Sequence, residues 1–208
     1  MSQYFAWFGL PGSFVLTCLI SLLALVLALI FRTSDRFVAA GAMFICSVGD
    51  IFMMDWNGVD TKVTELTGFG FTGPVLFMIG HLMYFWAFMI LLNRCGHRFL
   101  GDGTFYGLGI CTMTFIIMTA LFILRPDRDI PTYILGMIYL MVIGLTMLAV
   151  FSFTFAEGKW RLISAVGIMS FFLSDFIIGL NWLGGISEFD KYIWWLYPIG
   201  QILLLIGA

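Results

Sequence analysis

Two aspartates lie within long apolar runs of the sequence, and they are the residues best suited to chemistry. Asp50 ends the segment ICSVGD, and Asp175 lies within FFLSDFIIGLN. A charged side chain in the hydrocarbon region costs about 2.5–3.5 kcal/mol on insertion scales, so such residues usually serve a function. A low dielectric favours the neutral form of a carboxyl group, which can then act as a general acid. A second, ionised carboxylate would complete a two-carboxylate acid–base pair.

Further polar side chains accompany the aspartates at helical spacing. His81 and Tyr84 are three residues apart in GHLMY, and therefore share a helix face. Tyr197 and Gln201 are four residues apart in YPIGQ and also share a face. Counted at about 1.5 Å per residue from the expected outer helix ends, these pairs and the aspartates reach similar depths. The agreement predicts one polar pocket between the outer interface and the midplane, although interhelical hydrogen bonding would explain each residue separately.

The composition shows which solvent surrounds these residues. Of the 208 residues, 62% are hydrophobic and 11% are charged. Soluble domains are about half apolar and about a quarter charged, and a chain of this length could not bury so much apolar surface in water. We therefore expect lipid to surround most of the chain. The net charge of −2 gives no reason to expect nucleic acid as a partner.

Apolar runs long enough to cross a membrane predict the fold. A spanning helix needs about 20 mostly apolar residues, and the connections between the runs are short. We therefore predict an all-α fold: a polytopic transmembrane helix bundle of about seven helices, forming a single transmembrane domain over residues 1–208. The longest connection, about 55–70, is rich in Gly, Asp and Thr and predicts a surface loop. The predicted spans are roughly 13–31, 36–54, 71–92, 103–124, 132–155, 161–183 and 191–207.

The basic residues between the spans predict an orientation and a candidate phosphate contact. One side carries Arg32, Arg36, Arg94, Arg98, Lys159 and Arg161, and the other carries Lys62, Arg125, Arg128 and Lys191. The small excess on the first side predicts an outer N-terminus and an inner C-terminus, in the cytoplasmic membrane if the source is bacterial. The second group lies on the side of the predicted pocket, where each cation could contact a lipid phosphate or simply flank a helix.

Two other classes of membrane protein fit the sequence poorly. The only embedded histidine is His81, whereas a zinc-dependent membrane hydrolase needs about three histidines. A retinal protein needs a lysine in the middle of a span, but Lys191 lies at a helix end. The four cysteines form no CxxC pair, and we interpret them as reduced structural residues. We therefore predict neither a metal nor a cofactor. The cysteines are Cys18, Cys46, Cys95 and Cys111.

The ordered polar motifs resemble a known family. GD late in one helix, GHxxY in the next, SD in the penultimate helix and YPxxQ in the last resemble the YhhN-like family, which contains the lysoplasmalogenases. The segment YLMVIGLTM, with Tyr139 and Met147, is similar to the Tyr…Met helix of that family. The resemblance runs from about residue 41 to the end of the sequence. The family usually has eight helices, with two before the GD helix, whereas this chain has room for one.

The resemblance implies an activity and a substrate. Lysoplasmalogenases hydrolyse the vinyl ether bond of lysoplasmalogens, which are lysophospholipids, and release a fatty aldehyde and a glycerophospho-base. Asp50 and Asp175 match the two acidic positions of the family and are the expected catalytic residues. The sequence leaves open which of them is the acid, although Asp175 lies deeper.

The other polar residues and the competing functions complete the sequence-based expectations. His81, Tyr84, Tyr197 and Gln201 are expected to bind the substrate or hold the carboxylates and the attacking water. A proton-coupled transporter also places carboxylates and a histidine near the midplane, and it is the main alternative. A lipid-binding protein without catalytic activity is the other alternative that the sequence leaves open. The oligomeric state is also left open.

Overall fold

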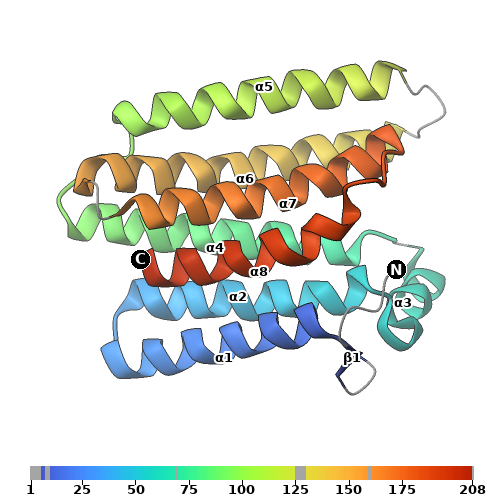
Figure 1. The fold of residues 1–208 in the computed structure, drawn as a ribbon, viewed down its shortest axis with the longest axis horizontal. Helices are drawn as coiled ribbons and strands as arrows, with labels where there is room; N and C mark the ends of the chain where they lie inside the picture. Colours follow the sequence, from blue (N-terminus) through green and yellow to red (C-terminus); the bar gives the residue numbers. More distant parts are fainter. Residues whose placement is uncertain (1–5, 8–9, 69, 125–129, 159–160, 208) are drawn as a thin grey trace. The chain divides into compact units, whose positions relative to one another are not determined.

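A computed structural model describes residues 6–7, 10–68, 70–124, 130–158 and 161–207 (Figure 1). Within these ranges it has seven long helices, which confirms the predicted all-α fold. A short helical segment occupies the predicted surface loop, and a pair of two-residue antiparallel strands, β1 (Ala6–Trp7) and β2 (Leu10–Pro11), precedes the first helix. The helices are α1 (Gly12–Phe31), α2 (Ser34–Met53), η1 (Trp56–Gly58), α3 (Val59–Thr67), α4 (Thr72–Arg94), α5 (Asp102–Leu124), α6 (Ile130–Glu157), α7 (Leu162–Gly184) and α8 (Asp190–Gly207).

Most of the long helices are suited to crossing a membrane. Over the described part of the chain, six helices are long and apolar enough to do so, namely α1, α2, α4, α5, α6 and α7. The seventh predicted span is also a helix, α8, but it is not one of these six. Asp190, Lys191 and Gln201 make α8 more polar than the others. The chain is therefore a multi-pass membrane protein.

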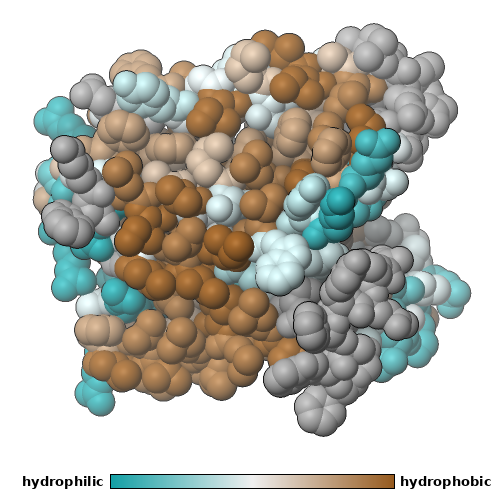
Figure 2. All heavy atoms as spheres, in the orientation of Figure 1, coloured by the Kyte–Doolittle hydropathy of each residue, from teal (hydrophilic) through white to brown (hydrophobic). Residues whose placement is uncertain are grey.

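The helices divide into two compact units, Gln3–Ala87 and Phe88–Ala208, with the division inside α4. In the first unit, α1 and α2 pack side by side (Figure 1). Glycines allow α4 to approach α2 closely: a Cβ added at Gly49 would lie 2.9 Å from Phe77, and one at Gly80 would collide with Cys46. The free face of α1 is covered with leucine and isoleucine side chains (Figure 2), as expected for a helix in lipid.

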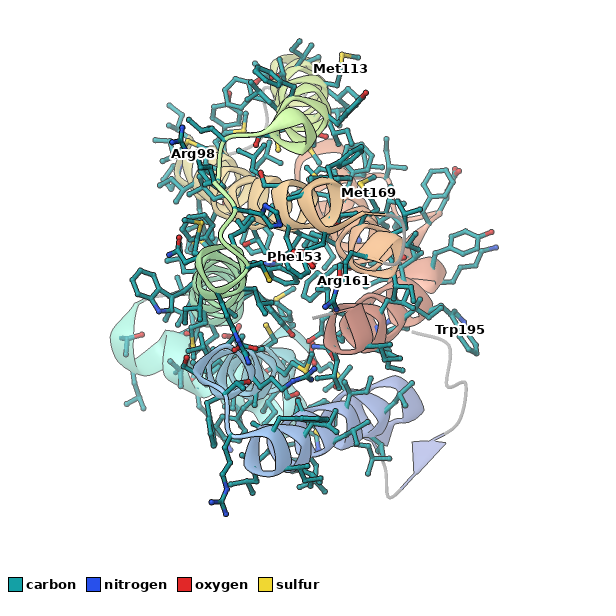
Figure 3. The ribbon with its side chains drawn as sticks, turned by 90° about the vertical axis from the view of Figure 1, so that its left-hand side faces the viewer. Arg98, Met113, Phe153, Arg161, Met169 and Trp195 are labelled. Carbon is teal, nitrogen blue, oxygen red and sulfur yellow. The ribbon has the colours of Figure 1, made fainter. Side chains whose placement is uncertain are left out.

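In the second unit, the backbones of α7 and α8 come into direct contact. A Cβ added at Gly200 of α8 would lie 2.8 Å from the backbone nitrogen of Phe171 and 2.9 Å from the carbonyl oxygen of Gly167. Such close approach through small residues is typical of helix pairs in membranes. Arg161, just before α7, donates a 2.9 Å hydrogen bond to the Gly207 carbonyl at the end of α8. The same guanidinium lies over the Phe153 ring (Figure 3).

The outer side chains of this unit are largely apolar. Met113 on α5 and Trp195 on α8 project away from their helices (Figure 3) and are about two-thirds exposed, at 60% and 66%. α5 packs on α6 and α7, and its remaining surface is open to lipid. Asp175 of α7 and Gln201 of α8, by contrast, are buried within this unit.

We expect Gly200→Ala to destabilise the protein because the added methyl group meets backbone atoms, which cannot move aside as a flexible side chain can. Overpacking of this kind typically costs about 1–3 kcal/mol. The thermal unfolding midpoint in detergent should fall by several degrees. Gly109→Ala on α5 is the matched control, because an added Cβ there has nothing within 4 Å. Equal midpoints for the two variants would contradict the close α7–α8 contact.

Candidate functional site

In the second unit, Asp175 is held by side chains of two helices. It lies on α7 and is 9% exposed. The phenol of Tyr139 on α6 donates a 2.7 Å hydrogen bond to Asp175 Oδ2. The hydroxyl of Ser174 lies 3.5 Å from Oδ1 but donates a shorter bond of 2.6 Å to the Phe171 carbonyl. Tyr139 therefore orients this carboxyl group directly.

The predicted pair on α8 forms a second polar contact in this unit. Gln201 is completely buried, and its Nε2 donates a 2.8 Å hydrogen bond to the Tyr197 hydroxyl. The Tyr197 ring packs edge-on against Phe171, with centroids 5.0 Å apart. Since Phe171 lies one turn before Asp175 on α7, the α8 pair is attached to the helix that carries the aspartate. Within the described residues no donor bonds to Gln201 Oε1, so this oxygen can accept a bond from water or substrate.

In the first unit, Asp50 lies near the end of α2 and is 4% exposed. The hydroxyl of Thr17 on α1 donates to Asp50 Oδ2 at 3.2 Å. One turn further along the same two helices, the hydroxyls of Ser21 and Ser47 are 2.8 Å apart. The contact between α1 and α2 therefore contains a row of buried polar groups that ends at Asp50.

His81 and Tyr84 are buried in α4, also in the first unit. Their ring centroids are 6.4 Å apart, as expected for residues on one helix face. His81 follows Gly80, where α4 approaches α2 at Cys46, one turn before Asp50. The predicted pair thus belongs to the same unit as Asp50. The sequence also predicted that these side chains and Asp175 line one pocket, and this stays a prediction. The side chains are Asp50, His81, Tyr84, Tyr197 and Gln201.

Sequence analysis missed several hydroxyl groups beside the aspartates. Thr17 and Ser21 are four residues apart in an otherwise apolar helix, and that spacing was the signal that could have indicated a polar face. Ser47 lies three residues before Asp50 and therefore shares a helix face with it. Tyr139 carried part of the family resemblance but was not among the predicted site residues. Its role beside Asp175 depends on how α6 is rotated, which the sequence does not show.

The structure describes two of the four basic residues that were predicted to contact a lipid phosphate. Lys62 is exposed on α3, with Nζ 3.4 Å from the Asn57 carbonyl, and the Lys191 ammonium lies 5.1 Å from the centre of the Tyr192 ring. Arg125 and Arg128 lie outside the described residues. Lys62 and Lys191 therefore stay candidates for contact with a phosphate.

The segment that carries Lys62 is fixed by a carboxylate. Asp55 accepts hydrogen bonds from the backbone nitrogen and the hydroxyl of Thr61, at 3.0 and 2.6 Å. The hydroxyl bond from Thr61 is the main reason that the pKa of Asp55 is lowered. Asp55 thus stays ionised and holds the first turn of α3.

Comparison with known proteins shows which family the chain belongs to. The YhhN family matches residues 12–208, a range that includes both aspartates and all seven long helices. The resemblance seen from about residue 41 thus extends back through α1. Neither a curated protein nor a solved structure matches the chain. Within the described residues, no group of three or more His, Cys, Asp or Glu side chains could hold a metal ion.

Proposed function

Because the chain belongs to the YhhN family, we propose that it is an intramembrane hydrolase of lysoplasmalogens. It cleaves the vinyl ether bond and releases a fatty aldehyde and a glycerophospho-base. The observation that carries this proposal is the pair of buried aspartates: Asp50 and Asp175 each accept a hydrogen bond from a hydroxyl group on a neighbouring helix. Burial and defined partners are what a carboxyl group needs to exchange protons with a substrate in a low dielectric.

The reaction explains why two carboxyl groups are needed. Hydrolysis begins with slow transfer of a proton to the β-carbon of the vinyl ether, which leaves an oxocarbenium ion. A neutral carboxyl group supplies this proton. The ionised carboxylate stabilises the cation and takes a proton from the attacking water, as in glycoside hydrolysis. The resulting hemiacetal breaks its bond to the glycerol oxygen, which takes up a proton as the aldehyde leaves.

The remaining polar residues support this chemistry. The fully buried Gln201 has its Oε1 available to accept a hydrogen bond from the attacking water or the hemiacetal hydroxyl. The Tyr197 hydroxyl accepts the hydrogen bond that orients the Gln201 amide, and His81 and Tyr84 add two further buried polar groups. The lipid phosphate stays at the interface, where Lys62 and Lys191 are exposed. The reaction needs no metal and no cofactor.

A proton-coupled transporter is the second candidate, and one observation favours it. Asp35, in the first turn of α2, is only 4% exposed, so α2 carries buried carboxyl groups at both ends. The hydrolase mechanism does not use Asp35. An acidic residue in the first turn of a helix is also stabilised by the helix dipole, which explains Asp35 without transport. Product analysis separates the two functions because only the hydrolase releases an aldehyde.

Three lysolipids with the same head group and chain length test the proposal on purified protein in detergent. They differ only in the bond at the first glycerol carbon, which is a vinyl ether, an alkyl ether or an ester. We expect aldehyde release from the vinyl ether alone, at the same rate with and without a metal chelator. If none of the three lipids reacts and vesicles containing the protein show proton-linked solute uptake, the transporter is the better account.

We expect Tyr139→Phe to lower kcat for aldehyde release by about 10–100-fold with little change in KM. The substitution removes the 2.7 Å hydrogen bond to Asp175 but keeps the ring. Hydrogen bonds to charged groups contribute about 1.5–3 kcal/mol, which corresponds to this range of rates. Tyr133→Phe on the same helix is the control because it removes a 3.3 Å contact with Thr119 instead. The same kcat in both variants would exclude a role for the Tyr139 hydroxyl.

A further inference from the structure

The first helix carries two buried hydroxyl residues, Thr17 and Ser21, which a simple membrane anchor does not need. We call them the polar stripe of α1. α1 is the most hydrophobic of the six helices suited to spanning a membrane. Its leucines are largely exposed to lipid (Figure 2), whereas Thr17 is 1% exposed and Ser21 is also buried. These two hydroxyl residues lie one turn apart on the face that packs against α2. Both hydroxyl groups also contact side chains of α2, so this face joins the two helices through polar groups.

The stripe fixes α1 against α2 at the level of Asp50. The hydroxyls of Ser21 and Ser47 are 2.8 Å apart across the two helices. Ser21 also donates to the Thr17 carbonyl at 3.0 Å, and Ser47 approaches the same carbonyl at 3.5 Å. The backbone of α1 is therefore held to α2 through the residue that contacts the aspartate.

The hydroxyl of Thr17 can bond to either protonation state of Asp50. It lies 3.2 Å from Asp50 Oδ2 and 2.9 Å from the Phe14 carbonyl. A hydroxyl group has one proton to donate and two lone pairs to accept. It can donate to an ionised carboxylate, or it can donate to the Phe14 carbonyl and accept a hydrogen bond from the O–H of a neutral carboxyl group. A hydroxyl group can therefore stay bonded to a carboxyl group that gains and loses a proton in every catalytic cycle.

A bond from threonine to its own helix is common, and Thr114 on α5 shows the ordinary case. Thr114 is buried and donates to the Ile110 carbonyl at 3.0 Å. Such back-bonding satisfies a hydroxyl within a helix. Thr17 makes the same kind of bond to Phe14 but also reaches a carboxyl group on another helix. Back-bonding alone does not explain that second contact.

We infer that Thr17 is a positioning residue for Asp50, so that α1 contributes to the active site as well as anchoring the chain. The inference rests on the proposed function, because it assigns Thr17 a part in the proton transfer. Thr17 holds the Asp50 carboxyl group in one position while its protonation changes. The paired serines Ser21 and Ser47 hold Thr17 at that position.

Three threonine variants test the inference through aldehyde release from a lysoplasmalogen. Thr17→Val keeps the shape of the side chain and should lower kcat by about 10–100-fold, with KM within about threefold. Thr17→Ser restores the hydroxyl and should return kcat to within about threefold of wild type. Thr114→Val makes the same change at a back-bonded threonine and should leave kcat unchanged. If Thr17→Val matches Thr114→Val, or if serine does not restore kcat, the inference is overturned.

Thermal unfolding separates failure of this inference from failure of the proposed function. If the wild-type protein releases no aldehyde, the proposed function fails, but the contact can still be measured in a double-mutant cycle of Thr17→Val and Asp50→Ala, because alanine removes the oxygen that Thr17 contacts. Residues in contact show non-additive effects, whereas distant residues show additive ones. We expect the combined shift in midpoint to differ from the sum of the two single shifts. Additive shifts would overturn the assigned contact between Thr17 and Asp50.

Discussion

Asp175→Asn is expected to reduce kcat for aldehyde release by at least about 10³-fold, within the range of general acid–base catalysis. Asparagine has nearly the shape of aspartate, and its amide oxygen can still accept the hydrogen bond from Tyr139. It cannot gain or lose a proton near neutral pH. The loss should therefore be catalytic, with an unfolding midpoint close to that of the wild type. Initial rates on a vinyl ether lysolipid and thermal unfolding in the same detergent provide the two measurements.

A second aspartate in the same unit provides the control for Asp175. Asp190 lies at the start of α8 and accepts a 2.8 Å hydrogen bond from Asn181. Asp190→Asn makes the same chemical change outside the proposed chemistry and should keep kcat within about threefold of wild type, as a substitution away from the reacting groups does. Full activity in Asp175→Asn would remove this residue from the mechanism. An equal loss in both variants would show that the change in charge, rather than proton transfer at Asp175, causes the effect.

Asp50→Asn is expected to cause a loss of similar size, at least about 10³-fold in kcat. The proposed mechanism gives the two carboxyl groups different roles, one as acid and one as base, so neither can replace the other. The Thr17 hydroxyl can still donate to the asparagine oxygen, and we therefore expect the fold to persist. Kinetics and thermal unfolding are measured as for Asp175.

Asp35→Asn is the matched control for Asp50 because it alters another buried carboxyl group on the same helix. In the hydrolase account Asp35 has no part in the reaction, so this variant should keep its kcat. A proton-coupled transporter could need both carboxyl groups of α2, and proton-linked uptake would then fall in both variants. Normal hydrolysis by Asp50→Asn would contradict the two-aspartate mechanism.

The helices were predictable because apolar runs of spanning length determine them. The run predicted at 13–31 is the helix Gly12–Phe31, and the run at 191–207 is Asp190–Gly207. The loop predicted at about 55–70 contains the helix Val59–Thr67 instead. Its sequence has few apolar residues, so the hydropathy pattern gave no signal for a helix. Gly58 and Gly68, both with positive φ, bound this helix, and the glycines alone had indicated a loop.

The burial of the main polar residues also followed from the sequence. Asp50 and Asp175 lie inside apolar runs that become helices, and a strongly polar side chain in a span faces the protein interior because exposing it to lipid is costly. His81 and Gln201 are buried for the same reason. The burial of Asp35 was not predicted. This residue follows Arg32 and lies near the start of a helix, and acidic residues at such positions are usually exposed in the first helical turn. Its burial comes from packing, which the linear sequence does not show.

The hydrogen-bond partners of the aspartates could not be predicted. Tyr139 is 36 residues from Asp175 in sequence, and Thr17 is 33 residues from Asp50. Which side chains meet across two helices depends on the rotation and axial offset of each helix. Those quantities are set by close packing at particular small residues, such as Gly200 on α8. A sequence can indicate a polar helix face without indicating what that face contacts.

Aldehyde release in D₂O tests the central claim most directly, because the proposed first step transfers a solvent-exchangeable proton from a carboxyl group to carbon. The aldehyde is reduced to the alcohol as it forms, because the hydrogens on the carbon next to an aldehyde carbonyl exchange with solvent. The alcohol is then analysed by mass spectrometry. The account predicts one deuterium at the carbon next to the former aldehyde carbon in the wild-type product, and no product above background from Asp50→Asn or Asp175→Asn. Product without deuterium at that carbon, or labelled product from either variant at the wild-type rate, would contradict it.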